Sequence, residues 1–173
     1  MNAVAAPRVL LASALLGVVV LSSRTGFGGG SATTMSVSAT VSNNCTVNAG
    51  ALSFGAYDPV SANATTPLNA TSTVTLTCTN GAATTIRLNQ GINPLTGSTA
   101  TVPLRQLAAT TNRLRYYIYQ DAARTTAWGD STAGKAFTGT GTAVAISVYG
   151  SIAAGQNVPA GSYGDTVTVT VNF

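Results

Sequence analysis

The chain has 173 residues, enough for one ordinary domain and short for two. Only 7% of the residues are charged, against roughly 25% in a typical soluble domain. Eight basic residues stand against four acidic ones, and histidine is absent. This composition excludes histidine-based catalytic triads and histidine metal sites, and it leaves too few clustered cations for a nucleic-acid surface. We therefore expect a protein that is not an enzyme, binds no nucleic acid and carries no cofactor or metal.

Residues 1–32 have the features of a secretory signal peptide. Arg8 precedes an uncharged, largely apolar run of 13 residues, 9–21, and small residues follow it. A membrane-spanning helix needs roughly 20 apolar residues, so this run is short for a span and fits a signal peptide. We predict cleavage after Ala32, with a cut near Ser23 or an uncleaved anchor as alternatives. The mature protein is then exported, without stable insertion into a membrane.

The two cysteines, Cys45 and Cys78, are 33 positions apart. An even number of cysteines in an exported protein favours a disulfide. Two thiolates without histidine cannot complete a tetrahedral metal site, and no neighbouring residue activates a free thiol. We therefore predict a disulfide between them, which stabilises a small exported domain.

Alternation of apolar and polar residues dominates the remaining chain, as in strands that bury one face. Turn signals such as Asn80-Gly81 and Asn93-Pro94 separate the alternating runs, and no amphipathic helix stands out. Many short strands without crossover helices predict one β-sandwich with Greek-key links. Residues 91–112 are the least regular stretch, and we expect a long loop there. The predicted strands are 33–42, 73–78, 86–88, 113–119, 144–148 and 166–173.

Five segments, in this order along the chain, resemble the spore coat protein U family. The family includes pilins of archaic chaperone–usher pili, such as those of the Csu type. The resemblance implies an all-β fold, an incomplete immunoglobulin-like β-sandwich that lacks one edge strand. In the fibre, the N-terminal strand of the next subunit completes such a sandwich by donor-strand complementation. The five segments are LSFGAYDP (52–59), LRYYIYQD (114–121), WGD (128–130), VYGSI (148–152) and QNVPAGSYGDTV (156–167).

With this resemblance, residues 33–44 are expected to be the donor strand and residues 45–173 the pilin domain. An ordinary first strand that pairs within its own sheet is the alternative for 33–42. A strand added to an open sheet edge gains main-chain hydrogen bonds, while its alternate side chains fill pockets. The expected pocket-filling side chains are those of Met35, Val37, Ala39 and Val41.

The last run of the chain, 166–173, is implied to form one wall of the acceptor groove. A periplasmic chaperone, and later the donor strand, would pair with this wall. An ordinary final strand of a sandwich is the simpler interpretation of the same alternation. The residues assigned to the groove are Val167, Val169, Val171 and Phe173.

These observations together predict a repeating structural subunit of a cell-surface pilus, exported through the periplasm and used in attachment and biofilm formation. Its expected partners are identical subunits, a periplasmic pilus chaperone and an outer-membrane usher. One alternative is a spore-coat or cell-surface matrix protein that associates without a chaperone. Another is a small glycan-binding module whose ligand-binding face consists of Arg113, Arg115, Tyr117 and Tyr119.

Overall fold

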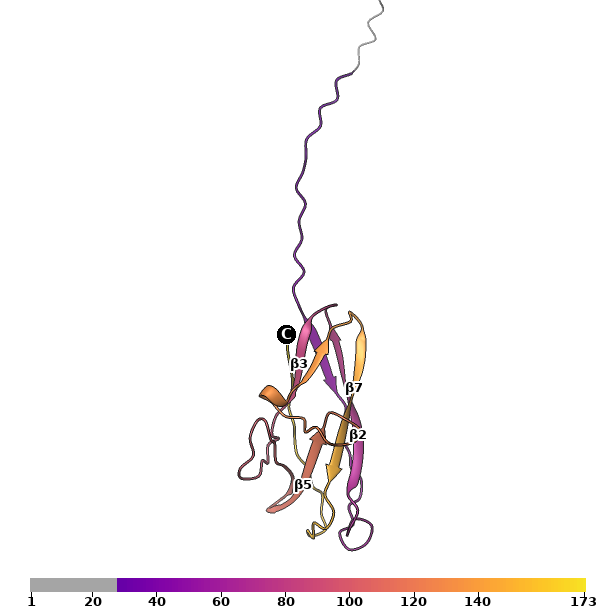
Figure 1. Ribbon diagram of the computed structural model, residues 1–173, viewed down its shortest axis with the longest axis vertical. Helices are drawn as coiled ribbons and strands as arrows, with labels where there is room; N and C mark the ends of the chain where they lie inside the picture. The colour runs from indigo at the N-terminus through magenta and orange to yellow at the C-terminus, as the bar shows by residue number, and fades with distance from the viewer. Residues whose placement is uncertain (1–27) are drawn as a thin grey trace, which may run out of the picture. The chain divides into compact units, whose positions relative to one another are not determined.

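The computed structural model describes residues 28–173, which fall into two units that divide after Ala39 (Figure 1). Residues 28–44 form no helix or strand, and their side chains are exposed. The strand predicted for 33–42 is therefore not formed within the single chain. Most of the predicted signal peptide lies outside the described residues. Within residues 28–173, no helix is long and apolar enough to cross a membrane.

The second unit is an all-β sandwich, which confirms the predicted fold class. Sheet A has the strand order β1–β2–β7–β5–β4, sheet B has the order β6–β3–β8, and neighbouring strands are antiparallel. One short 3₁₀ helix, Ser131–Ala133, precedes β6. The strands are β1 (Cys45–Ala49), β2 (Leu68–Cys78), β3 (Ala83–Leu88), β4 (Arg105–Ala109), β5 (Asn112–Tyr119), β6 (Lys135–Thr138), β7 (Ala143–Ile152) and β8 (Val169–Asn172).

The alternating residues of the long strands place one apolar face between the sheets. In β2 the buried positions Val74, Leu76 and Cys78 alternate with threonines, and Val74 lies opposite Ile146 of β7. Tyr116 of β5 is 3% exposed, as the alternation of that strand predicts. The fully buried core is Val74, Leu76, Cys78, Ala82, Ile86, Leu88, Leu114, Tyr116, Ile118, Trp128, Val148 and Ile152.

Parts of the sequence-based assignment are wrong. The expected loop at 91–112 contains β4, which forms a hairpin with β5 through a turn at Thr110, whose φ is 52°. β1 and β6 were not predicted, and the C-terminal strand is shorter than the run 166–173. β1 and β6 are short and carry weak alternation, so pairing with a neighbouring strand defines them. The C-terminal run alternates throughout, but it pairs with β3 only from Val169 onward.

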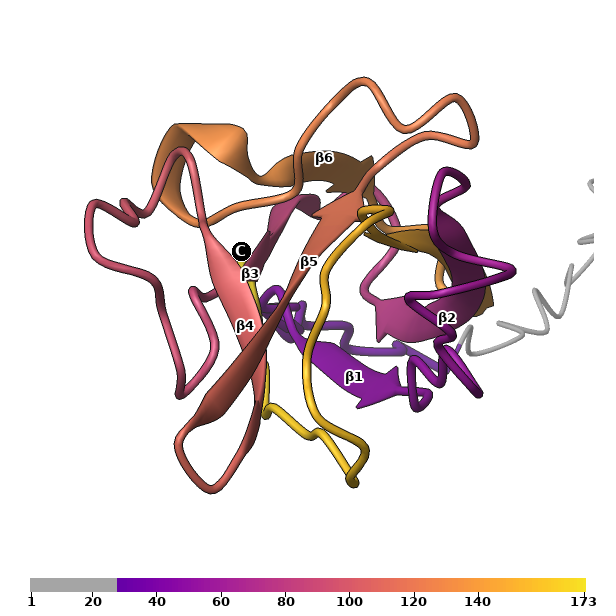
Figure 2. The same cartoon turned by 90° about the horizontal axis from the view of Figure 1, so that it is seen from below.

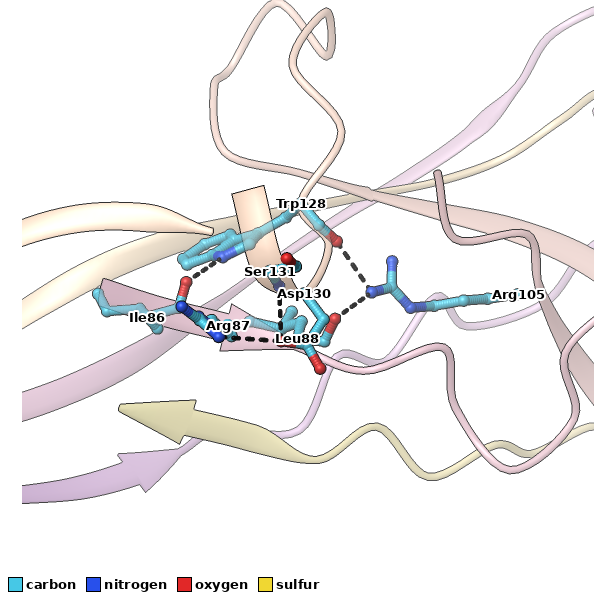
Figure 3. Close-up of polar contacts among 7 residues, drawn as sticks. All are labelled: Ile86, Arg87, Leu88, Arg105, Trp128, Asp130 and Ser131. Carbon is cyan, nitrogen blue, oxygen red and sulfur yellow. Dashed lines mark hydrogen bonds and ion pairs between the residues drawn. The ribbon is translucent and has the colours of Figure 1, made fainter. Parts of the chain in front are cut away.

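Arg105 and Trp128 link the two sheets in the interior (Figure 3). Arg105 of β4 is 1% exposed, and its Nη2 donates to the carbonyls of Leu88, Asn89 and Trp128 at 3.0, 2.6 and 2.8 Å. Trp128 is fully buried, and its Nε1 donates to the Ile86 carbonyl at 3.0 Å. Burial lowers the pKa of Arg105 to about 10. These bonds hold the end of β3 against β4 and thereby fix Leu88 beside the groove described next.

Candidate functional site

Each sheet has one outer strand at the same side of the sandwich. β1 pairs only with β2, and β8 pairs only with β3, among the described residues. β1 and β8 also lie close to each other. Figure 2 shows the C-terminal segment in yellow between β1 and the β4–β5 hairpin. Two strand edges therefore border one opening into the core.

This opening is an apolar groove of about 430 Å³. One wall is the chain from Ala49 to Phe54, directly after β1, and the other is the chain from Asp165 to Val169. The floor consists largely of core side chains from both sheets, which are at most 5% exposed, so the groove is an apolar recess that ends on the core. The floor residues are Ser72, Val74, Leu88, Leu107, Tyr116, Ile118 and Val148.

The first wall follows β2 without continuing as a strand. The amide of Gly50 donates to the Thr73 carbonyl at 2.8 Å, and beyond it Leu52 and Phe54 are half-buried. Both side chains pack on Gly150, where a Cβ atom would lie 2.8 Å from Leu52 Cδ2 and from Phe54 Cζ. A larger residue at position 150 would therefore displace the side chains of Leu52 and Phe54 from sheet A.

The second wall is the run toward β8. Asn89 holds this wall at Thr168. The Asn89 amide donates to the Thr168 carbonyl at 3.1 Å, and Asn89 Oδ1 accepts from the Thr168 amide at 2.9 Å. Val167 and Val169 line the groove, while Val171 packs against the core outside it. Phe173 is 55% exposed and does not line the groove. Of the four residues assigned to this wall from the sequence, two lie at the groove.

One end of the groove is polar. The Tyr116 hydroxyl donates to Asp165 Oδ2 at 2.7 Å, and Asp165 Oδ1 accepts from the Ile92 amide at 3.0 Å and from Asn93 Nδ2 at 3.2 Å. Burial raises the pKa of Tyr116 well above its usual value, and the hydrogen bond to Asp165 raises it further. Sequence reasoning missed this pair, because 49 positions separate two residues that the sandwich brings together.

The side chains assigned to the donor strand are exposed to solvent in the single chain. Met35, Val37 and Val41 are 86%, 88% and 83% exposed, and Ala39 is exposed as well. Such exposure of alternating apolar side chains is unfavourable in water. The segment is therefore an apolar strand sequence without a partner in the single chain.

The predicted disulfide is present and marks the start of the sandwich. Cys45 and Cys78 face each other in the β1–β2 pair and are bonded. Directly before it, Thr79 Oγ1 accepts from the Asn44 amide at 3.0 Å, and the Thr79 amide donates to the Asn44 carbonyl at 2.9 Å. The Thr79 hydroxyl also donates to the Asn44 carbonyl at 3.3 Å. Residues 44 and 45 are thus attached to the end of β2 by a covalent bond and by three hydrogen bonds.

Comparison with known proteins identifies a family and a curated protein that this chain resembles in sequence. The chain matches the Spore Coat Protein U domain family over residues 31–170. It is 42% identical over 144 residues to Protein U of Myxococcus xanthus, covering 78% of this chain and 80% of that protein.

A similar solved chain occurs in the crystal structure of the CsuC–CsuE chaperone–tip adhesion subunit pre-assembly complex from archaic chaperone-usher Csu pili of Acinetobacter baumannii. The TM-score is 0.56 with 25% sequence identity over 78% of this chain. This chain spans 40% of the length of the solved one. The likeness agrees with an immunoglobulin-like sandwich and with a structural rather than an enzymatic protein.

Proposed function

This chain belongs to the Spore Coat Protein U domain family, and on that premise we propose that it is a structural subunit of a chaperone–usher pilus. The observation that carries the proposal is the apolar groove between the β1 and β8 sides of the sandwich. In an ordinary closed sandwich a further strand would cover this line. We propose that residues 33–44 of a neighbouring copy supply that strand.

The groove and the N-terminal segment have complementary properties. The groove is lined by core side chains next to the unpaired edge of β8. The N-terminal segment exposes apolar side chains at every second position, those of Met35, Val37, Ala39 and Val41. A strand inserted antiparallel to β8 would bond to its free edge and point these side chains at the core. Burial of a Val or Met side chain contributes roughly 1.5–3 kcal/mol, so three of them supply several kcal/mol before ordering costs.

Head-to-tail assembly follows from this complementarity. Every copy carries one donor segment and one groove, and the two are different surfaces, so the contact is heterologous and propagates into a fibre. Residues 1–32 are then a leader that is removed before the donor segment acts. This mechanism needs no covalent chemistry beyond the Cys45–Cys78 disulfide.

The unpaired edge of β8 needs a partner before assembly, so that the subunit does not aggregate. An unpaired, apolar sheet edge promotes aggregation. We propose that a periplasmic chaperone occupies the groove first and that an outer-membrane usher then exchanges it for the donor segment. The similarity to a chain from a chaperone–subunit complex supports this order. The fibre then stands on the cell surface, where attachment and biofilm formation are its proposed roles.

The decisive experiment compares two single variants, each of which places one negative charge on a different face of the donor segment. In Val37→Asp the carboxylate would enter the apolar groove, where an unpaired charge is strongly unfavourable. In the control, Ser38→Asp, the same charge lies on the opposite face, toward solvent. We expect cells with Val37→Asp to export the subunit in chaperone-bound form without fibres by negative-stain electron microscopy. The Ser38→Asp strain should build normal fibres, and normal fibres from both strains would refute the proposal.

A further inference from the structure

The outer face of sheet A carries a patch of tyrosines and arginines that the proposed assembly does not use. Alternation in β5 points its odd-numbered residues away from the core, and the register places Tyr119 opposite Tyr149 of β7. Arg124, in the loop after β5, lies over the ring of Tyr149, with its Cζ 5.9 Å from the ring centroid. We name this patch the Tyr/Arg face: Arg113, Arg115, Tyr117, Tyr119, Arg124 and Tyr149.

The aromatic rings of the Tyr/Arg face are fixed in place. The rings of Tyr117 and Tyr119 lie 6.2 Å apart at 32° to each other, and both are half-buried. Arg124 Nε donates to the Gly150 carbonyl at 3.1 Å, which holds its guanidinium against sheet A. A shallow pit of about 50 Å³ opens beside Tyr117 and Arg115. The rings thus form a preorganised surface with little rotamer freedom to lose on binding.

The charge of the face is positive. The five strands of sheet A contain no acidic residue. Asp121 follows β5 and is ionised, since the amides of Thr126 and Thr125 donate to its carboxylate and lower its pKa to about 2. Against this one negative charge the face carries three guanidiniums, those of Arg113, Arg115 and Arg124, so it stays net positive. Among residues 28–173 the one ion pair is Arg87–Asp130, which involves β3 of the other sheet. The guanidinium of Arg115 is exposed and available to an anionic ligand. Arg113 Nη1 donates to the carbonyls of Thr110 and Asn112 at 2.9 and 3.0 Å, which leaves its other N–H groups for such a ligand.

We propose that the Tyr/Arg face binds an acidic polysaccharide. Tyrosine rings pack against the apolar faces of sugar rings and offer a hydroxyl at their edge. Guanidinium groups pair with carboxylate or sulfate groups through two parallel hydrogen bonds. An open sheet face accommodates an extended chain, whereas a buried pocket would admit only a short ligand. In a fibre the face would recur on every copy, so weak individual sites would add up by multivalency.

The test uses the secreted protein, without residues 1–32, as it is recovered from cells, and two forms of one polymer. Polygalacturonate carries a carboxylate on each sugar, and its fully methyl-esterified form has the same backbone without the charge. We expect binding of polygalacturonate, measured by biolayer interferometry at 50 mM salt, and at least about tenfold weaker binding of the ester. Equal binding of both polymers, or no binding of polygalacturonate, would overturn the proposal.

Matched variants locate the site. Arg115→Gln removes one positive charge from the Tyr/Arg face, and Arg87→Gln removes one from sheet B. Loss of one solvent-exposed ion pair predicts about two- to fivefold weaker binding for Arg115→Gln. Arg87→Gln should bind like the wild type, and Tyr117→Leu, which keeps apolar bulk on the sheet, should also weaken binding. Equal losses for Arg115→Gln and Arg87→Gln would show attraction by net charge alone and would refute the site.

Discussion

Single residues determine how the groove keeps its shape. Asp165 belongs to the second wall, and Tyr116 belongs to sheet A, so their hydrogen bond links this wall to sheet A through side chains. Next to it, Gly164 and Ala108 of β4 exchange two backbone hydrogen bonds. Asp165 also accepts from the loop that carries Ile92 and Asn93. With its hydroxyl inside the sandwich, Tyr116 contributes both to the floor and to this link.

The variant Tyr116→Phe tests the link. It removes the hydroxyl and leaves Asp165 Oδ2 without this donor, and loss of a hydrogen bond to a charged group costs about 1.5–3 kcal/mol. The control Tyr163→Phe removes a hydroxyl that donates to the Pro159 carbonyl at an exposed position. Urea unfolding should show the larger loss of stability for Tyr116→Phe. Equal losses for both variants would contradict this assignment.

The raised pKa of Tyr116 adds a pH dependence to the same prediction. In the folded protein the phenol keeps its proton above pH 10, while in the unfolded chain it is released near its ordinary pKa of 10.0. The stabilisation from Tyr116 is therefore complete below pH 10 and declines as the pH rises beyond it. The stability deficit of Tyr116→Phe should shrink above pH 10. A constant deficit between pH 8 and pH 11 would contradict the sign.

At the scale of elements, β1 is the strand with the least packing of its own. Four of its five residues are exposed, and it pairs with β2 alone. The disulfide at its first residue therefore has more effect on β1 than on any strand inside the sheet. Covalent attachment of β1 also anchors the donor segment that precedes it.

Removal of the disulfide should loosen β1 selectively. In the double variant Cys45→Ser/Cys78→Ser, the unfolded state regains roughly 3–4 kcal/mol of chain entropy, as expected for a loop of this length. Hydrogen exchange by mass spectrometry should show faster exchange in β1 than in the wild type. The internal control is β7, which pairs on both sides within sheet A and should change only with the global stability. Unchanged protection of β1 would contradict the prediction.

The predictability of each element follows from its length and alternation. β5 is a long strand with one buried face, and its alternation predicted nearly all of it. In β2 and β7 alternation predicted only 73–78 and 144–148, because small residues interrupt the inward-facing apolar positions, Ala70 and Ser72 in β2 and Gly150 in β7. β4 was expected to be loop because it places Arg105 inside the sandwich, where alternation suggests an apolar residue. That position is tolerated only because three carbonyls from distant segments accept from its guanidinium. Hydrogen bonds between segments that are distant in sequence cannot be predicted from the alternation within one segment.

At the scale of the whole molecule, the two walls of the groove consist mostly of chain without regular secondary structure. The chain from Gly50 to Phe54 and the chain from Asp165 to Thr168 form no regular strand. Period-two patterns therefore predicted the strands around the groove, while the resemblance to a family implied that one strand was missing. The Tyr116–Asp165 link at its end required the assembled fold, because it joins residues from distant parts of the chain.

An unfilled groove predicts that a strand supplied from the same chain will convert the subunit into a stable monomer. Residues 33–42, fused after Phe173 through a linker of about four residues, can turn back and pair antiparallel with β8. The intramolecular segment has a high effective concentration, so it should outcompete donor segments of other copies.

Its burial of several kcal/mol should raise Tm by roughly 10 °C or more. Size-exclusion chromatography and thermal unfolding report both effects. The same fusion with Val37→Asp in the added segment is the matched control, since it should neither block polymerisation nor raise Tm. If both fusions polymerise alike and unfold at the same temperature, the groove does not accept this segment. The apolar opening between β1 and β8 would then require another occupant.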